Sequence, residues 1–463
     1  MPRKLIRASQ VDVKRGSPWE NDIFDRKRAG EMLCNLILSL DQPFVIAING
    51  GWGSGKTVFL RRLGEHLKTQ TPRSHSVYLD AWSTDWHDDP LLALVLAVNE
   101  TLAAAGYVKS GELGRKVVGN AAQLAAPTAM ITAHLLAPGT GPIAGAVAKA
   151  GAEAIKSASD RARAKRGLED SLKEARDLLL QRQSGRPISG QVVVIIDELD
   201  RCRPDYAIRM LERIKHLFHI AGYVFVIATD NVNLRGAVKT VYGHETDGEQ
   251  YLRKFFDFEM HLRRPDPLQF TKALIEQFEI LPRNWMESPK WRSLELKNFH
   301  LSEPLDSEEQ WLEAISEYCR CSEKFSLSLR DQAQAFSLLN AMMLTHRDRQ
   351  AFLPPVAAFL SCLRFGHERA FDLIKTGGID SLRKVAADHQ RYGVPSDYLL
   401  TLCRLLERPE NRWAETLTSL QAETSTSNFA ERISARLGAA NEWSKLPIML
   451  NDIIFMVNDT IQN

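Results

Sequence analysis

The sequence has few cysteines and lacks the patterns that define secreted or zinc-bound proteins. Its 463 residues include six cysteines, which are too few and too scattered for a disulfide framework. Cys319 and Cys321 form a C-x-C pair, but no second ligand pair for zinc lies nearby in the sequence. The segment Met1–Leu5 is basic and lacks the apolar core of a signal peptide. We therefore expect a reduced, cytoplasmic protein.

An excess of charge of either sign is also missing. Lys and Arg number 59 and Asp and Glu number 57, so the formal net charge is only +2. Such a balanced chain has no global basic field that would attract nucleic acid. The length predicts two to three domains with ample apolar core.

A glycine-rich stretch lies between a short apolar run, Phe44–Ile48, and a helix-compatible segment, Val58–Leu67. It has the form G-x-x-x-x-G-K-T, the phosphate-binding loop in its strand–loop–helix context. Backbone N–H groups of such a loop cradle a triphosphate at a helix N-terminus. Lys56 is expected to reach the β- and γ-phosphates, and the Thr57 hydroxyl to bind Mg²⁺. The expected nucleotide-binding residues are Gly50, Gly51, Trp52, Gly53, Ser54, Gly55, Lys56, Thr57 and Val58.

A second motif ends the apolar run Gln191–Ile196 with two carboxylates, Asp197 and Glu198. A near-continuous apolar run is typical of a strand buried on both faces of a parallel sheet. Ligands bind at the carboxyl ends of such strands. Asp197 is expected to hold Mg²⁺, usually through water, and Glu198 to orient or deprotonate the attacking water. The two motifs together predict an α/β protein that binds and hydrolyses a nucleoside triphosphate.

These motifs resemble the KAP family of P-loop NTPases. The segments that carry the resemblance are Gly51-Trp52-Gly53-Ser54-Gly55-Lys56-Thr57, Leu79-Asp80-Ala81-Trp82 and Ile196-Asp197-Glu198-Leu199-Asp200-Arg201-Cys202, with weaker matches at residues 21–40 and 251–256. The resemblance covers roughly residues 15–345. It implies a parallel sheet flanked by helices, of the type with an additional strand between the two motif strands. It also implies ATP rather than GTP. The family often has Asp where this chain has Glu198, and glutamate is the stronger choice for a water-activating base.

Four further residues are candidates for nucleotide sensing or for contacts between subunits. Thr229 follows the apolar run 223–228, where related NTPases carry a γ-phosphate sensor; a helix-capping turn fits equally well. Arg330 lies where related NTPases carry a sensing arginine on a helical lid, and a helix-start arginine is the alternative. Arg253 and Lys254 are candidates for action in trans across an oligomer interface.

Other residues near the motifs have two interpretations each. Arg201 directly follows the acidic cluster, where it is expected to pair with Asp200 or Asp197. At and just beyond the end of the predicted strand 76–82, polar and aromatic side chains either line the nucleotide site or cap a turn. They are Asp80, Trp82 and Asp85.

The stretch 117–148 contains no Asp, Glu, Lys or Arg. Related KAP proteins commonly carry transmembrane helices at this location, and a membrane-spanning helix needs about 20 predominantly apolar residues. Here alanine contributes little to membrane insertion, and several polar side chains dilute the run. They are Asn120, Gln123, Thr128, Thr132 and His134. A helical hairpin packed on the core or on another subunit is the favoured interpretation, and membrane insertion is the alternative.

Periodicity predicts three regions. Residues 1–265 form the P-loop NTPase core, with an inserted small-residue helical segment at about 108–187; residues 266–349 form a helical lid, and residues 350–463 a helical C-terminal region. The inserted segment includes a charged helix at 155–182. Apolar residues recur at helical spacing in the segments 268–279, 308–320, 328–345, 356–376, 394–407, 411–423 and 428–438.

We therefore expect an ATPase with ATP and Mg²⁺ as cofactors, acting as a conformational or assembly switch. Family analogy adds bacterial anti-phage defence as a setting. One alternative is a DNA-processing ATPase, against which the balanced charge counts. The other is an interaction scaffold that nucleotide only stabilises, against which the intact Glu198 counts. The expected partner is a second copy or another protein; nucleic acid stays open, as does membrane contact through 117–148.

Overall fold

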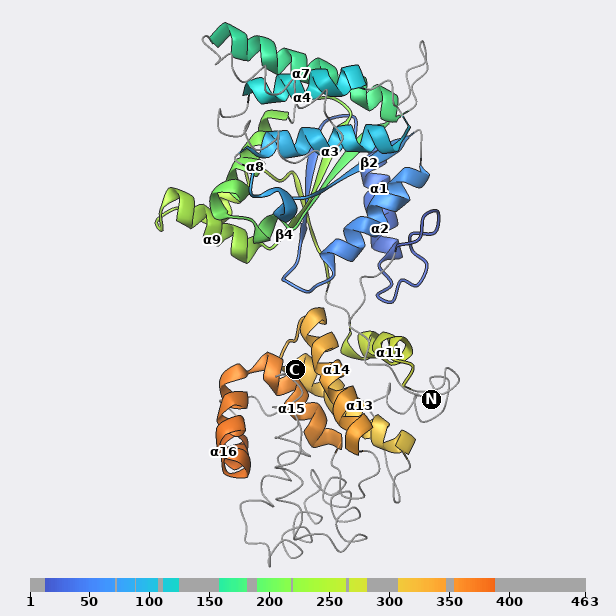
Figure 1. Ribbon diagram of the computed structural model, residues 1–463, viewed down its shortest axis with the longest axis vertical. Coiled ribbons are helices and arrows are strands. Elements are labelled where there is room, and N and C mark those ends of the chain that lie inside the picture. The colour runs from blue at the N-terminus through green and yellow to red at the C-terminus, as the bar shows by residue number, and fades with distance from the viewer. Residues whose placement is uncertain are drawn as a thin grey trace, which may run out of the picture. The chain divides into compact units, whose positions relative to one another are not determined.

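The computed structural model describes two compact units, which divide between residues 264 and 265 (Figure 1). The described residues are 13–70, 73–87, 89–106, 111–124, 158–180, 190–217, 220–263, 266–280, 307–346 and 354–387. The first unit contains both sequence motifs, and the second contains the helices that follow residue 265.

The described part of the first unit is built on a parallel sheet of five strands in the order β2-β3-β4-β1-β5. The strands are β1 (Phe44–Asn49), β2 (Ser74–Asp80), β3 (Gln191–Asp197), β4 (Tyr223–Thr229) and β5 (Phe258–His261). The phosphate loop follows β1 and the paired carboxylates end β3, so β4 lies between the two motif strands. The additional strand implied by the family resemblance is confirmed.

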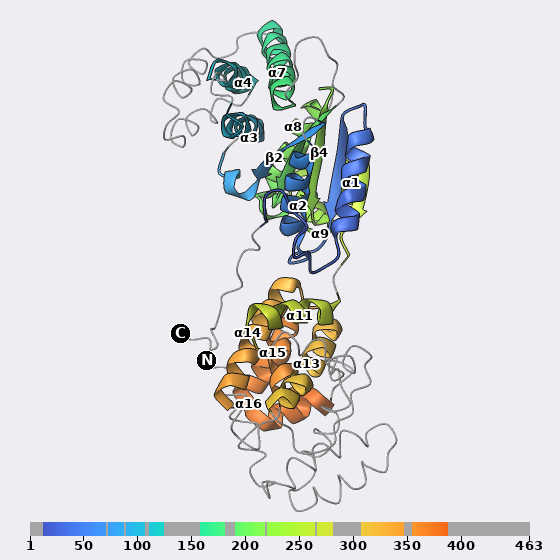
Figure 2. The same ribbon diagram turned by 90° about the vertical axis from the view of Figure 1, so that its right-hand side faces the viewer.

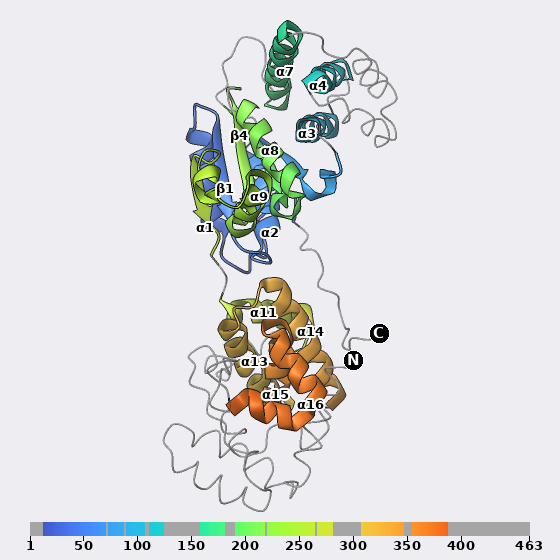
Figure 3. The same ribbon diagram turned by 90° about the vertical axis from the view of Figure 1, so that its left-hand side faces the viewer.

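Helices cover both faces of this sheet because the central strands are apolar along their whole length. All residues of β3 and β4 are buried. Val193 and Ile195 face α1 (Lys27–Ser39) and α2 (Lys56–Thr69), whereas Val192 and Val194 face the opposite side. That side is covered by α3 (Pro90–Ala104) and α8 (Pro204–Leu217). Figures 2 and 3 show α1 and α3 on opposite sides of the sheet.

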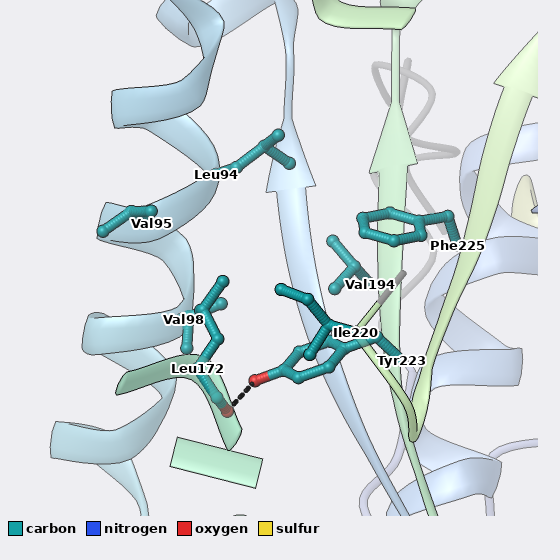
Figure 4. Close-up of a pocket in the computed structure, with 8 residues that line it drawn as sticks. All are labelled: Leu94, Val95, Val98, Leu172, Val194, Ile220, Tyr223 and Phe225. Carbon is teal, nitrogen blue, oxygen red and sulfur yellow. Dashed lines mark hydrogen bonds between the residues drawn. The ribbon is translucent and has the colours of Figure 1, made fainter. Parts of the chain in front are cut away.

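Between β2 and β3 the chain adds a helical layer that packs on α3. This layer contains α4 (Gly111–Leu124) and α7 (Ala158–Leu179). A small apolar cavity lies where α3, α7 and the sheet meet (Figure 4). At its edge the Tyr223 hydroxyl donates a hydrogen bond of 2.7 Å to the carbonyl of Leu172 in α7. The layer is therefore joined to the sheet by a buried polar contact as well as by apolar packing.

The start of the charge-free stretch 117–148 is part of this layer. Val117, Val118, Ala121 and Ala122 of α4 are buried in the same core as the side chains of α7. Residues 125–148 lie outside the described part of the chain. None of the described helices is both long enough and apolar enough to cross a bilayer.

Shorter elements complete the first unit next to the carboxyl ends of the strands. Two 3₁₀ turns, η1 (Trp82–Thr84) and η3 (Leu199–Arg201), follow β2 and β3. Two helices, α9 (Asn231–Tyr242) and α10 (Gly248–Leu252), lie between β4 and β5.

The second unit is helical in its described part (Figure 3). Its helices are α11 (Pro267–Gln277), α13 (Ser307–Lys324), α14 (Leu329–His346), α15 (Pro354–Gly366) and α16 (Glu368–Ala387). They enclose a separate core that includes Tyr318, Phe336 and Phe359. The assignment of a lid at 266–349 and of a further helical region at 350–463 stays a prediction. The expected helices at 394–407, 411–423 and 428–438 lie outside the described residues.

One helix prediction in this unit was wrong. The segment 356–376 was expected to form one helix, but α15 ends at Gly366 and α16 begins at Glu368. Gly366 packs so closely on Phe325 that an added Cβ would lie 2.4 Å from the Phe325 Cβ. The ring nitrogen Nδ1 of His367 accepts a hydrogen bond of 3.3 Å from the Ala370 N–H, which caps the new helix.

Candidate nucleotide site

The candidate site lies at the carboxyl ends of the parallel strands. In the sheet register Asp80 is opposite Asp197, and Asn49 is opposite both Thr229 and His261. Parallel strands end at the same edge, so this register brings polar side chains from far apart in the sequence to one edge. The phosphate loop leaves β1 at this same edge.

Glycine is required in the phosphate loop for two separate reasons. Gly53 and Gly55 have φ angles of 69° and 85°, in the left-handed region that glycine adopts without strain. Gly50 lies so close to its own loop that an added Cβ would be 2.7 Å from Ser54 Oγ. The loop ends where α2 begins at Lys56, and no side chain caps that end of α2. The first N–H groups of α2 can therefore bind an anion.

A buried arginine that the sequence analysis missed supports the outer side of this loop. Arg26 is 8% exposed, and its Nη2 donates hydrogen bonds to the carbonyls of Ser54 (2.8 Å) and Arg263 (3.1 Å). Its Nη1 donates to the Gly55 carbonyl at 3.3 Å. Burial lowers the pKa of Arg26 to about 10, against the opposing charge of Asp22. Nothing in the sequence distinguishes Arg26 from the neighbouring basic residues Lys27 and Arg28.

Lys56 is held by its own loop and by a carboxylate after β3. Its Nζ donates to the Gly50 carbonyl and, at 3.4 Å, to the Gly51 carbonyl. It lies 3.7 Å from Oδ2 of Asp200, and the two side chains are 9% and 2% exposed. The same Asp200 oxygen accepts a hydrogen bond of 2.7 Å from Trp52 Nε1. Burial raises the pKa of Asp200, while Lys56 and Trp52 act in the opposite direction. Asp200 therefore connects both motifs, which the sequence analysis did not predict.

Asp197 is buried and fixed at both oxygens. Its Oδ1 accepts a hydrogen bond of 2.9 Å from the Glu198 N–H, and its Oδ2 accepts one of 2.6 Å from the Tyr78 hydroxyl. Tyr78 comes from the neighbouring strand β2 and was not singled out from the sequence. Burial and the adjacent Asp197 charge raise the pKa of the Tyr78 hydroxyl. Tyr78 therefore keeps its proton, donates a hydrogen bond to the carboxylate and sets the orientation of Asp197.

Glu198 stands between the two motifs in a strained backbone conformation. Its φ is 60°, which is uncommon for a residue with a side chain and is often found at functional sites. Its Oε1 accepts a hydrogen bond of 3.1 Å from Thr57 Oγ1. Burial and the charge of Asp197 raise the pKa of Glu198, against the effects of Arg201 and Thr57. The hydrogen bond between Thr57 and Glu198 directly joins the start of α2 to the end of β3.

The expected pairing of Arg201 with Asp200 or Asp197 was wrong. Arg201 Nε lies 2.5 Å from Oε2 of Glu198 instead. The reason is local: η3 reverses the chain after Glu198, so the residue three positions later faces that carboxylate. Asp200 is turned toward Lys56 on the other side.

The candidate sensor residues have different surroundings. Thr229 is fully buried, and its hydroxyl has no hydrogen-bond partner among the residues that the structure describes. The capping of α9 is performed by Asp230, whose Oδ1 accepts a hydrogen bond of 3.1 Å from the Val232 N–H. Arg330 is exposed in the first turn of α14, in the second unit. A sensing role for either residue stays a prediction.

The residues after β2 have mainly structural contacts. Asp80, the last residue of β2, accepts at Oδ1 a hydrogen bond of 3.1 Å from the N–H of Ser83 in the turn η1. Asp85 accepts one of 3.2 Å from the Arg203 N–H. Trp82 is 53% exposed, and the Arg201 guanidinium carbon lies 5.7 Å from the centre of its ring.

The donor chemistry of the site fits Mg²⁺. Thr57 and Asp197 offer oxygen atoms, which Mg²⁺ prefers, and it commonly uses one or two carboxylates together with substrate phosphates. Within the described ranges, no group of three or more His, Cys, Asp or Glu side chains could hold a metal by itself.

The strand order and the glycine loop before α2 define the class of the protein, a P-loop NTPase of the additional-strand type. The family model described as the KAP family P-loop domain matches residues 27–347, and the chain therefore belongs to the KAP family. The chain thus contains the nucleotide-binding domain of a P-loop NTPase.

Solved structures and curated proteins add little to this assignment. The ORC2 protein of Aeropyrum pernix, solved as ADPNP-ADP complexes, is 13% identical over 96% of this chain and 99% of its own, with a TM-score of 0.34. Drosophila ORC bound to DNA is 12% identical over 92% and 98%, with a TM-score of 0.31. TM-scores this low carry no argument about function. Among curated proteins, none matches this sequence.

Proposed function

We propose that this protein is a Mg²⁺-dependent ATPase that works as a conformational or assembly switch. The observation that carries the proposal is the hydrogen bond of 3.1 Å between Thr57 Oγ1 and Oε1 of Glu198. It brings the candidate base to the residue that would hold the metal. Catalysis at such a site consists of positioning and charge stabilisation and needs little covalent chemistry from the protein.

Each side chain then has a defined role. Lys56 and the loop N–H groups bind the β- and γ-phosphates, and Thr57 and Asp197 hold Mg²⁺, which when bound neutralises phosphate charge. Glu198 orients a water in line with the γ-phosphate and accepts its proton. The buried Thr229 hydroxyl, which lacks a partner among the described residues, senses the γ-phosphate. ATP is preferred to GTP by family analogy.

The switch is supported by the contacts of Lys56. Phosphate oxygens compete with Asp200 for the Lys56 ammonium group, which lies 3.7 Å from the carboxylate. Binding of a triphosphate therefore changes the partners of Asp200 and Trp52, and Trp52 is 57% exposed. A change at the phosphates thus reaches the protein surface, where a second copy or another protein would bind.

The first experiment compares ATP hydrolysis and particle size, with and without Mg-ATP, for the wild type and Glu198→Gln. We expect turnover by the wild type alone and an assembly that persists in the variant. Glu65→Gln is the matched control, because Glu65 pairs with the exposed Lys68 on α2 and should leave both measurements unchanged. ATP binding without turnover in the wild type would contradict the proposal and favour a nucleotide-stabilised scaffold.

The biological setting rests on family analogy alone. We propose bacterial anti-phage defence as that setting, with the switch acting through assembly. The test is protection of a bacterial host by the wild type and loss of protection in Lys56→Ala. Equal protection by the wild type and Lys56→Ala would show that defence does not depend on nucleotide binding.

A further inference from the structure

Arg201 is the residue after the acidic strand that directly contacts the candidate base. Its Nε lies 2.5 Å from Oε2 of Glu198, and its side chain is 25% exposed. On its other side the guanidinium carbon lies 5.7 Å from the ring centre of Trp82, which is 53% exposed. The guanidinium therefore contacts both a carboxylate and a solvent-exposed aromatic ring.

Both carboxylate oxygens of Glu198 have partners in this arrangement. Oε1 accepts the hydrogen bond from Thr57, and Oε2 forms the charge-assisted contact with Arg201. Charge-assisted contacts of this length are the stronger hydrogen bonds in proteins. A carboxylate fixed in this way must give up the Arg201 contact before Oε2 can turn toward a water beside the phosphates.

Two neighbouring cations, Lys56 and Arg203, contact other residues. Lys56 pairs with Asp200 on the opposite side of η3. Arg203 donates hydrogen bonds to Asp85.

We infer that Arg201 is a positioning residue that restrains Glu198, so that hydrolysis requires Arg201 to move away. This inference rests on the proposed ATPase function and adds a regulatory contact to the same site. Phosphate oxygens offer the guanidinium a competing anion of matching geometry, and the contact with the Trp82 ring does not depend on the charge of Glu198. Release of Glu198 from Arg201 thus depends on whether nucleotide phosphates are bound at the phosphate loop.

The test is a steady-state comparison of ATP hydrolysis by the wild type, Arg201→Met and Arg201→Lys. Arg201→Met removes the charge and should raise kcat about fivefold, the rate equivalent of losing one partly exposed ion pair. KM for ATP should change by less than about twofold, because the restraint acts on the base and not on nucleotide affinity. Arg201→Lys keeps a cation beside Glu198 and should restore a rate close to that of the wild type.

Two controls assign the effect to Glu198. Arg209→Met removes an arginine that pairs with Asp205 on α8, and it should leave kcat unchanged. In the double variant Glu198→Gln with Arg201→Met, the gain in kcat should disappear. If Arg201→Met does not fold, Arg201→Gln provides the same comparison with a neutral side chain.

The possible outcomes distinguish failure of the Arg201 restraint from failure of the proposed ATPase function. If the wild type hydrolyses ATP and Arg201→Met has an equal or lower kcat, the restraint is overturned while the ATPase stands. A gain that persists in the Glu198→Gln background also overturns it. If neither the wild type nor Arg201→Met hydrolyses ATP, the ATPase proposal fails and the restraint fails with it.

Discussion

Polar and charged side chains at the site form pairs that join the two motifs. Lys56 of the loop is matched by Asp200 after β3, and Thr57 is matched by Glu198. Removing one member of a buried pair leaves the other without its partner, which costs more than the pair contributes. Single substitutions here should therefore change stability as well as activity, and the two effects can be separated by removing both partners.

Lys56→Ala should abolish ATP binding and lower the free energy of unfolding by about 1–3 kcal/mol, because Asp200 loses its cation while remaining buried. Adding Asp200→Asn should restore most of the stability but none of the binding. Urea unfolding of both variants measures the free energy of unfolding, and nucleotide titration measures ATP binding. A Lys56→Ala protein as stable as the wild type would mean that the Lys56–Asp200 contact contributes nothing.

Arg26→Met should weaken ATP binding about tenfold, because the carbonyls of Ser54, Gly55 and Arg263 lose a shared donor and the loop loses its fixed shape. Arg28→Met is the matched control, since Arg28 is exposed in the first turn of α1, two residues after Arg26. Calorimetric titration with ATP distinguishes them. Equal losses in both variants would point to general charge rather than to support of the loop.

At the scale of elements, the sequence predicted the strands that consist of buried apolar residues. β1, β3 and β4 lie at the expected positions because a strand buried on both faces needs continuous apolar residues. β5 was missed because its four residues are mostly exposed and include Glu259 and His261. Asp200, Tyr78 and Arg26 were missed for a different reason. Their roles come from contacts between elements that are distant in sequence, which local patterns do not carry.

Two helical glycines provide a test of packing at this scale. Gly236 in α9 faces open space, so Gly236→Ala should raise the free energy of unfolding by about 0.5–1 kcal/mol through helix propensity. Gly366→Ala should instead lower it by about 1–3 kcal/mol, because the new Cβ would lie 2.4 Å from that of Phe325. Thermal unfolding monitored by circular dichroism measures both. Opposite signs are expected; a stabilised Gly366→Ala would contradict the close packing that ends α15.

At the scale of the whole molecule, each unit has its own apolar core. The sheet unit is packed around residues of β3, β4 and their flanking helices, and the helical unit around residues such as Tyr318 and Phe336. Units with separate cores can unfold separately. A ligand that binds one folded unit then stabilises that unit by mass action.

Calorimetry of the full chain should therefore show two transitions, of which Mg-ATP raises only one. At a nucleotide concentration of about 100 times Kd, the stabilisation of that unit is about 2.7 kcal/mol. In Lys56→Ala the nucleotide should shift neither transition. A single transition that moves as a whole on adding Mg-ATP would show that the two units unfold together.

The position of β4 has a geometric consequence for the chemistry. Neighbouring strands in a sheet are about 4.8 Å apart, so the ends of β1 and β3 are separated by about 10 Å. That width is set by the backbone of an intervening strand and does not depend on the side chains of either motif. In the proposed ATPase, the phosphates and an in-line water would lie across this span, between the loop and the carboxylates. Thr229, at the end of β4, lies in the middle of that span, so a change in the length of this one strand would alter the fit for the reacting group.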